Sequence, residues 1–143
     1  MKDQIKIMLV EDQPDYRDAI KLALDKTSDL NLVSMYGTAE KAILSMERTQ
    51  PDVILLDLHL LGMSGIDAIP KFRECSPDSH IIVLTNSNRE GDILAAISHG
   101  ATGYLLKCAS LKQIIEGIHT VMRGGASLDP GVAKLIMHHM PEI

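Results

Sequence analysis

Aromatic residues are nearly missing from this chain, which has no Trp, one Phe and three Tyr among 143 residues. A hydrophobic core must therefore consist of Ile, Leu, Val, Met and Ala, and a hydrophobic content of 45% is sufficient for one globular domain. Cysteine is also scarce. Cys75 and Cys108 have no metal-ligand spacing, which favours reduced thiols over a disulfide framework.

Long apolar segments are missing too. No run approaches the roughly 20 residues that span a membrane, and the segment MKDQIKIMLVED carries charges where a signal peptide needs an apolar stretch. We therefore predict a cytoplasmic protein with no membrane contact. There is no excess of basic residues, and the net charge of −5 argues mildly against nucleic-acid binding by this segment. A DNA-binding domain elsewhere is not excluded.

The chain does contain short apolar runs bounded by polar residues, a pattern typical of buried parallel strands. These runs are residues 5–10, 30–35, 53–56, 81–84 and 104–106. Helical patterns alternate with them, and four side chains mark helix starts: Pro14, Thr38, and the pair Ser110 and Gln113. Five strands and five helices in alternation predict right-handed crossovers and a parallel sheet covered on both faces.

The composition changes after Gly125, and we predict one domain over residues 1–126. Residues 127–143 are expected to form a linker with a short sixth helix, in which Asp129 is the N-cap and Pro130 the first residue. Pro141 would end this helix. One apolar stripe is expected on it, formed by Ala133, Ile136, Met137 and Met140.

Polar side chains follow four of the apolar runs. Glu11 and Asp12 follow the first, Asp57 follows the run at 53–56, Thr85 the next and Lys107 the last. The carboxyl ends of parallel strands meet at one edge of the sheet, where open α/β sheets place their sites. We therefore expect three carboxylates, a cation and a hydroxyl to lie together, and such a cluster suits a divalent metal and a phosphoryl group.

Each of these positions also has an ordinary interpretation. Paired acids or a lone Asp at a strand end are commonly caps or solvated turns, Lys107 alone would be a surface lysine, and Thr85 suits any strand. A flavin or nucleotide binder on the same fold is another alternative, although no Gly-rich phosphate loop follows the first strand. The coincidence of five positions at one sheet edge favours the phosphoryl site.

Four segments in order, MLVEDQPDYRDAI, PDVILLDLHLLGMSGID, IIVLTNSN and GATGYLLK, resemble the receiver domain of two-component response regulators over roughly residues 5–125. The stretches GATGYLLKCAS and VMRGGASLDPGVAKL are similar to the NarL/FixJ-like subfamily, whose members carry a C-terminal LuxR-type helix-turn-helix domain. The resemblance implies a flavodoxin-like (CheY-like) α/β fold. Its doubly wound, five-stranded parallel sheet has the order 2-1-3-4-5, with five helices and the short C-terminal helix.

The resemblance also implies roles for individual residues. Asp57 would be the phosphoacceptor, and Lys107 and Thr85 would contact oxygens of the phosphoryl group. Thr85 and Tyr104 would form the switch, in which the aromatic side chain turns inward behind the loop after the fourth strand. His59 and Ser87 stand where family members tune hydrolysis of the phosphoryl group.

The implied cofactor is Mg²⁺, a hard cation that prefers oxygen ligands. Its protein ligands would be Glu11, Asp12, Asp57 and the backbone carbonyl of His59. The family usually has Pro after a cis peptide where Cys108 stands here. A cis bond before Cys would cost about 2.5–4 kcal/mol, so we expect this peptide to be trans or strained.

The implied function is a switch that accepts a phosphoryl group from a sensor histidine kinase and controls transcription through a DNA-binding domain absent from this chain. Homodimerisation on phosphorylation is one expected response, and no catalysis beyond the domain's own phosphoryl transfer and hydrolysis is expected. A phosphatase of the haloacid-dehalogenase type is an alternative, but it needs a second acid where His59 stands. An unphosphorylated interaction module is disfavoured by the intact acidic set.

Overall fold

The computed structural model describes residues 4–140, in which six strands alternate with six helices. The strands are β1 (Ile5–Val10), β2 (Leu30–Tyr36), β3 (Val53–Leu56), β4 (His80–Thr85), β5 (Gly103–Leu106) and β6 (Ser127–Leu128). The helices are α1 (Pro14–Asp25), α2 (Ala39–Thr49), α3 (Gly65–Cys75), α4 (Glu90–Ser98), α5 (Leu111–Met122) and α6 (Pro130–His138). None of these helices is long and apolar enough to cross a membrane.

The strands form one parallel sheet in the order β2-β1-β3-β4-β5-β6. The expected order of the first five strands is confirmed, but the expectation of a five-stranded sheet was wrong. Ser127 and Leu128, expected in a linker, pair with Gly103 and Tyr104 of β5. They do so because β5 would otherwise be an edge strand with unpaired backbone groups. A two-residue strand shows no periodicity in the sequence, so it could not be predicted from a pattern.

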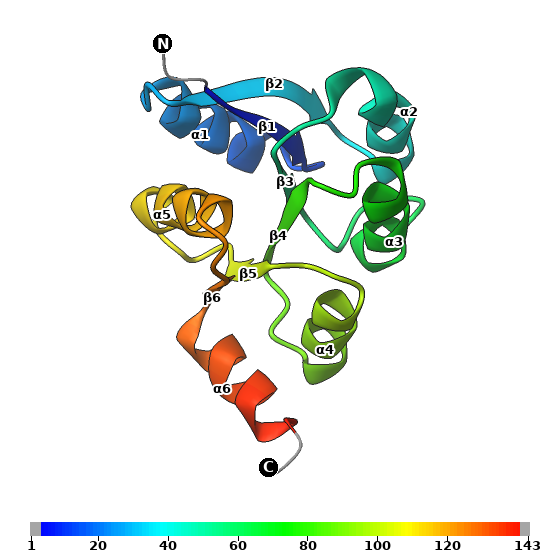
Figure 1. Cartoon of the computed structure of the whole chain (residues 1–143), viewed down its shortest axis with the longest axis vertical. Helices are drawn as coiled ribbons and strands as arrows, with labels where there is room; N and C mark the ends of the chain where they lie inside the picture. The colour runs from blue at the N-terminus through cyan, green and yellow to red at the C-terminus, as the bar shows by residue number, and fades with distance from the viewer. Residues whose placement is uncertain (1–3, 141–143) are drawn as a thin grey trace.

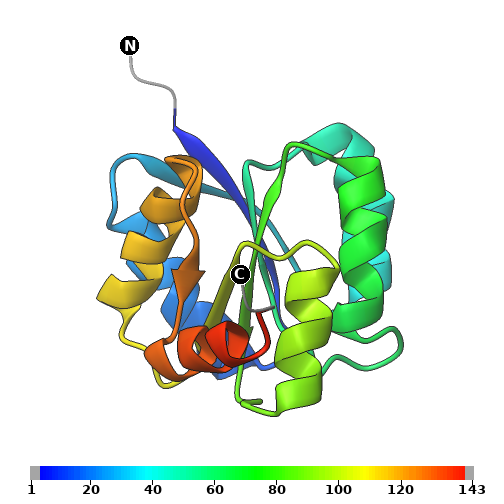
Figure 2. The ribbon, with the colours of Figure 1, turned by 60° about the horizontal axis from the view of Figure 1, so that its bottom comes forward.

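Helices α1 and α5 cover one face of the sheet, and α2, α3 and α4 cover the other (Figure 1). Figure 2 shows the same two layers from below, with the sheet between them. Successive strand residues alternate between the two cores: Ile7 and Leu9 pack with α1 and α5, whereas Met8 and Val10 face the other layer. The central strand β3 is therefore apolar and buried along its whole length, as expected for a sheet covered on both faces.

The expected helix starts are all found. The Thr38 hydroxyl accepts a hydrogen bond from the Lys41 backbone, and Ser110 forms a capping box with Gln113. The Asp129 carboxylate accepts hydrogen bonds from the first two backbone N–H groups after Pro130. These caps satisfy donors that the first turn of a helix leaves unpaired, which is why short polar side chains at these positions predict helix starts well.

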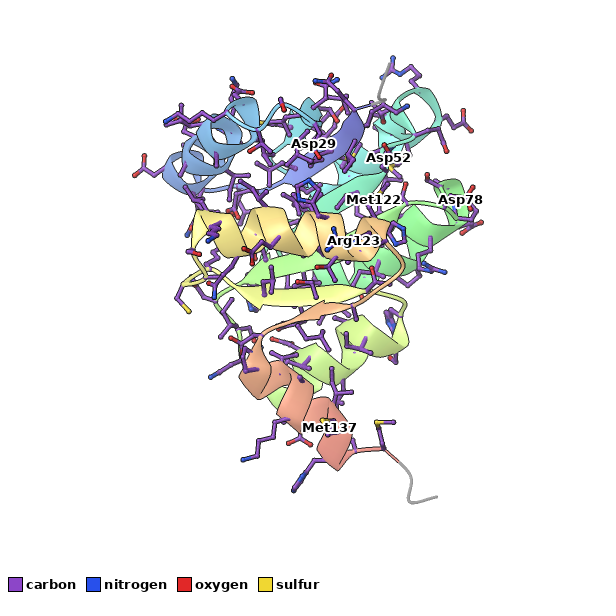
Figure 3. The ribbon with its side chains drawn as sticks, turned by 60° about the vertical axis from the view of Figure 1, so that its left-hand side comes forward. Asp29, Asp52, Asp78, Met122, Arg123 and Met137 are labelled. Carbon is purple, nitrogen blue, oxygen red and sulfur yellow. The ribbon has the colours of Figure 1, made fainter. Side chains whose placement is uncertain are left out.

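Helix α6 lies against α4, and the apolar stripe predicted for it is correct for Ile136 but wrong for Met137 and Met140. Val132, Leu135 and Ile136 pack on the core of the α4 layer. Met137 and Met140 are instead 69% and 60% exposed, and Figure 3 shows Met137 on the outer part of α6. The cap at Asp129 and the pairing of β6 set the rotation of this helix about its axis, and neither is visible in its own periodicity. Pro141, expected to end the helix, lies outside the described residues.

Gly65 begins α3 against the backbone that carries Asp57. A Cβ at Gly65 would lie 2.3 Å from the Asp57 carbonyl oxygen and 2.7 Å from the Leu58 Cα. Because both neighbours are backbone atoms, Gly65→Ala is expected to lower the free energy of unfolding by about 1–3 kcal/mol, measured by urea denaturation.

Gly91 provides the matched control, because it is a helical glycine of α4 with open space around its Cβ position. Gly91→Ala is expected to keep or raise the free energy of unfolding, by up to about 1 kcal/mol from helix propensity. Equal stability of the two variants would contradict the close approach of α3 to the Asp57 backbone.

Candidate functional site

The site lies at the carboxyl edge of the sheet, where β1, β3, β4 and β5 end. Glu11 and Asp57 are buried, with exposed fractions of 1% and 4%, and Thr85 is fully buried. Asp12 is half-buried beside them, and the side chain of Lys107 is 8% exposed. The structure therefore brings the five residues singled out from the sequence to one place, where they are largely shielded from water.

The ammonium group of Lys107 lies between two carboxylates. Its Nζ is 2.9 Å from Glu11 Oε1 and 3.2 Å from Asp57 Oδ2. Burial alone would lower the pKa of Lys107, but the hydrogen bond to Glu11 and the charges of Asp57 and Glu11 outweigh it and raise the pKa. Lys107 is therefore a permanent positive charge next to Asp57 at physiological pH.

The three acids form a compact set of oxygen donors. One carboxylate oxygen from each of Glu11, Asp12 and Asp57 lies within 4.8 Å of the others. Burial raises the pKa of Glu11, and the charge of Asp57 adds to this, against the opposing hydrogen bonds from Gln13 and Lys107. Clustered carboxylates repel one another, so this set of hard oxygen donors fits a divalent cation such as Mg²⁺. His59 lies in the loop between β3 and α3, and its backbone N–H donates a hydrogen bond to Asp57 Oδ1 at 3.3 Å.

Tyr104 lies inside the domain, behind the loop that follows β4. Its side chain is fully buried, and its hydroxyl donates a 2.7 Å hydrogen bond to the backbone carbonyl of Ser87. Burial raises the pKa of Tyr104 to about 12, which keeps the hydroxyl protonated as a donor. The backbone N–H of Ser87 in turn donates to Thr85 Oγ1 at 3.3 Å. The two residues expected to form the switch are thus connected through Ser87.

Two residues at the site were not identified from the sequence. Gln13 Oε1 accepts a hydrogen bond from Lys107 Nζ at 3.3 Å, and the Gln13 backbone N–H donates to Glu11. The ring centroid of Tyr16 lies 4.9 Å from Lys107 Nζ, within cation–π range. Gln13 directly follows the Glu11-Asp12 pair and Tyr16 comes four residues after Asp12, and this closeness in sequence was the one available signal.

The Lys107–Cys108 peptide is trans, since no peptide bond in residues 4–140 is cis.

Other acids lie at the opposite edge of the sheet. Asp29, Asp52 and Asp78 precede β2, β3 and β4, and Figure 3 shows them toward the end of the molecule where α5 finishes at Met122. The carboxylates of the site are therefore a separate group from these strand-start acids.

The family model of the response regulator receiver domain matches residues 7–119. The chain is 32% identical over 142 residues to the nitrate/nitrite response regulator protein homolog of Haemophilus influenzae, covering 99% of this chain and 68% of the relative. It is also 32% identical over 130 residues to the nitrate/nitrite response regulator protein NarL of Escherichia coli, covering 91% and 60%. The chain thus spans about two thirds of the length of these curated relatives.

Among solved structures, a two-component response regulator of the LuxR family from Aurantimonas sp. superposes with a TM-score of 0.88. The sequence identity is 26%, and the superposition covers 95% of this chain and 97% of that chain. This likeness confirms the expected α/β fold class. The superposition also extends past β5 into the C-terminal segment, because residues before β6 alone could not make up 95% of this chain.

Asp12 adds a negative charge to a cluster that is balanced by Lys107. In buffer without divalent cations, Asp12→Asn is expected to raise the free energy of unfolding by on the order of 1 kcal/mol, because it removes a like-charge repulsion. Saturating Mg²⁺ should stabilise the unmodified protein, by about 2.7 kcal/mol at one hundred times the dissociation constant, and should stabilise Asp12→Asn far less.

Urea denaturation with and without MgCl₂ measures both effects. Asp78→Asn, the same substitution at the opposite edge of the sheet, serves as the control and should respond to Mg²⁺ as the unmodified protein does. A Mg²⁺ response of equal size in Asp12→Asn would argue against a cation site at these three carboxylates.

Proposed function

The chain belongs to the response regulator receiver domain family, and on this premise we propose that it is a switch operated by phosphorylation of Asp57. The observation that carries the proposal is the contact of the Asp57 carboxylate with Lys107 Nζ at 3.2 Å, inside a largely buried group of acids. This arrangement gives a carboxylate nucleophile and a fixed cation next to it. Both are needed where a phosphoryl group is transferred and held.

In the proposed reaction a carboxylate oxygen of Asp57 attacks the phosphorus of a phosphohistidine on a sensor histidine kinase, and the P–N bond breaks as the P–O bond forms. Negative charge is then spread over the phosphoryl oxygens, so catalysis consists mostly of positioning and electrostatic stabilisation. Lys107 supplies the positive charge and Thr85 a hydroxyl donor. Bound Mg²⁺, with Glu11, Asp12, Asp57 and the His59 carbonyl as its proposed ligands, would supply further charge neutralisation.

The conformational response is proposed to begin at Thr85. Because Thr85 Oγ1 accepts a hydrogen bond from Ser87 N–H, its own hydrogen remains available for a phosphoryl oxygen. That contact would favour the arrangement in which Ser87 and Tyr104 are held together, and phosphorylation would shift the population toward it. The proposal therefore assigns the switch to Thr85 and Tyr104.

The C-terminal segment contacts Tyr104 of this switch and, separately, helix α4. The Asp129 backbone N–H donates to the carbonyl of Tyr104 at 3.0 Å, directly after β6. At the other end of α6, His139 Nε2 lies 2.6 Å from Glu90 Oε1 of α4. A change at Tyr104 or α4 would thus reach α6. We propose that α6 conveys the change to a transcriptional output domain, which the longer relatives have room for and which would carry DNA binding. Homodimerisation on phosphorylation is part of the same proposal.

Incubation with acetyl phosphate and Mg²⁺ is expected to add the mass of one phosphoryl group to the protein, and Asp57→Asn should lose this addition completely. Intact-mass spectrometry measures the change, and size-exclusion chromatography of the same samples tests the oligomeric response. Asp78→Asn, at the opposite edge, should be labelled normally. A label on Asp57→Asn that survives acid and is lost in base would show that another carboxylate is the acceptor.

His59 is predicted to affect the lifetime of the phosphoryl group. Its imidazole is 55% exposed beside the site, and its backbone contacts Asp57. His59→Ala should open the site to water and change the rate of phosphoryl loss several-fold, with faster loss expected, in a decay assay after removal of acetyl phosphate. Leu61→Ala, at a 77% exposed position of the same loop, is the control and should decay at the normal rate. Equal rates for the two variants would reject a role for the His59 side chain.

A further inference from the structure

Asp92, in the first turn of α4, connects α4 to the loop that follows β4. Its carboxylate is 15% exposed, and its Oδ2 accepts a 2.5 Å hydrogen bond from the Ser87 hydroxyl. The guanidinium group of Arg89 lies 3.4 Å from the same oxygen. A hydroxyl bound to a partly buried carboxylate forms a strong, charge-assisted hydrogen bond. Asp92 therefore restrains the side chain of Ser87.

Ser87 is held at all three of its polar groups. Its N–H donates to Thr85 Oγ1, its hydroxyl donates to Asp92, and its carbonyl accepts the hydrogen bond of Tyr104. Thr85 and Tyr104 belong to the proposed switch, whereas Asp92 is outside it and has no contact with Asp57 among the described interactions. Asp92 thus acts on the switch through Ser87.

Asp92 also approaches the loop on the other side of Asp57. Its Oδ2 lies 3.8 Å from Nε2 of His59, which follows β3. The carboxylate is therefore placed between the two loops that border the proposed phosphoryl site. Acids are generally favourable at a helix N-terminus, but this does not explain the contacts of Asp92. Glu90 is also in the first turn of α4, and it contacts His139 and not Ser87.

We propose that Asp92 is a positioning residue for the switch, and that it holds Ser87 so that Thr85 and Tyr104 occupy the phosphorylated arrangement before phosphorylation takes place. This inference rests on the proposed function, in which Asp57 is the phosphoacceptor. Without Asp92, the loop after β4 is less ordered before phosphorylation. Part of the free energy of the phosphoryl contacts is then used to order this loop. The population with Tyr104 inside then falls in both states, on the order of tenfold for the loss of one charge-assisted hydrogen bond.

The three tyrosines of the chain make this population measurable. Incorporation of 3-fluorotyrosine gives three ¹⁹F resonances, and Tyr104→Phe identifies the one from Tyr104. In Asp92→Ala the Tyr104 resonance is expected to move toward the position of a solvent-exposed ring, with and without acetyl phosphate, and labelling of Asp57 should be slower. Asp92→Asn should restore much of the original spectrum, because its amide oxygen can still accept the hydrogen bond from Ser87.

A double-mutant cycle separates the hydrogen bond from other effects of Asp92. Ser87→Ala removes the same bond, so the double variant Ser87→Ala/Asp92→Ala should resemble either single variant. Asp67→Ala is the control, since it removes an exposed first-turn charge of α3 that has no contact to Ser87, and its Tyr104 resonance should be unchanged. Circular dichroism on every variant excludes unfolding as the cause.

The inference is overturned if Asp92→Ala keeps the unmodified Tyr104 resonance, or if the effects of Asp92→Ala and Ser87→Ala simply add. Failure of the proposed function has a different signature, because acetyl phosphate would then leave the mass of the unmodified protein unchanged. The spectra of the unphosphorylated variants would still decide whether Asp92 positions Tyr104.

Discussion

The structure depends on the balance of charge at the carboxyl edge of its sheet. The fold gathers Glu11, Asp12 and Asp57 so that their oxygens lie within 4.8 Å, in a place where burial of Glu11 raises its pKa. Lys107 offsets this repulsion through contacts of 2.9 and 3.2 Å. A cation or a phosphoryl group bound at this edge, as proposed above, would act on the same balance of charge, and Lys107 would then couple ligand binding to stability.

Behind these acids, a set of polar groups forms hydrogen bonds with one another: those of Thr85, Ser87, Asp92 and Tyr104. A buried hydroxyl needs a partner, and Tyr104 finds it in the carbonyl of Ser87. Because Ser87 also contacts Thr85 and Asp92, a displacement of any one of them disturbs the others. The carbonyl of Tyr104 in turn accepts the hydrogen bond at the end of β6. The site is thereby connected to the C-terminal helix by short contacts between neighbouring elements.

The features that could be predicted from the sequence are those that depend on neighbouring residues. Apolar runs predicted the five long strands because both sheet faces are buried, and capping residues such as Thr38 and Ser110 predicted helix starts because a cap acts within its own first turn. The strand order came from the family resemblance. Strand β6 was missed because its pairing with β5 is a tertiary contact. The prediction for the packed face of α6 was wrong for Met137 and Met140. This helix carries two apolar stripes, and only its packing against the domain selects the one with Val132.

The same distinction holds for the site. Glu11, Asp57, Thr85 and Lys107 were determined by the sequence alone, because a polar residue at the end of a buried parallel strand must emerge at the carboxyl edge. Which side chains then meet was decided by tertiary structure. The contact of Lys107 with Gln13 spans 94 residues, and the bond between Ser87 and Asp92 depends on how α4 is set against the loop after β4. Such contacts follow from the packing of whole elements, which no local pattern of residues encodes.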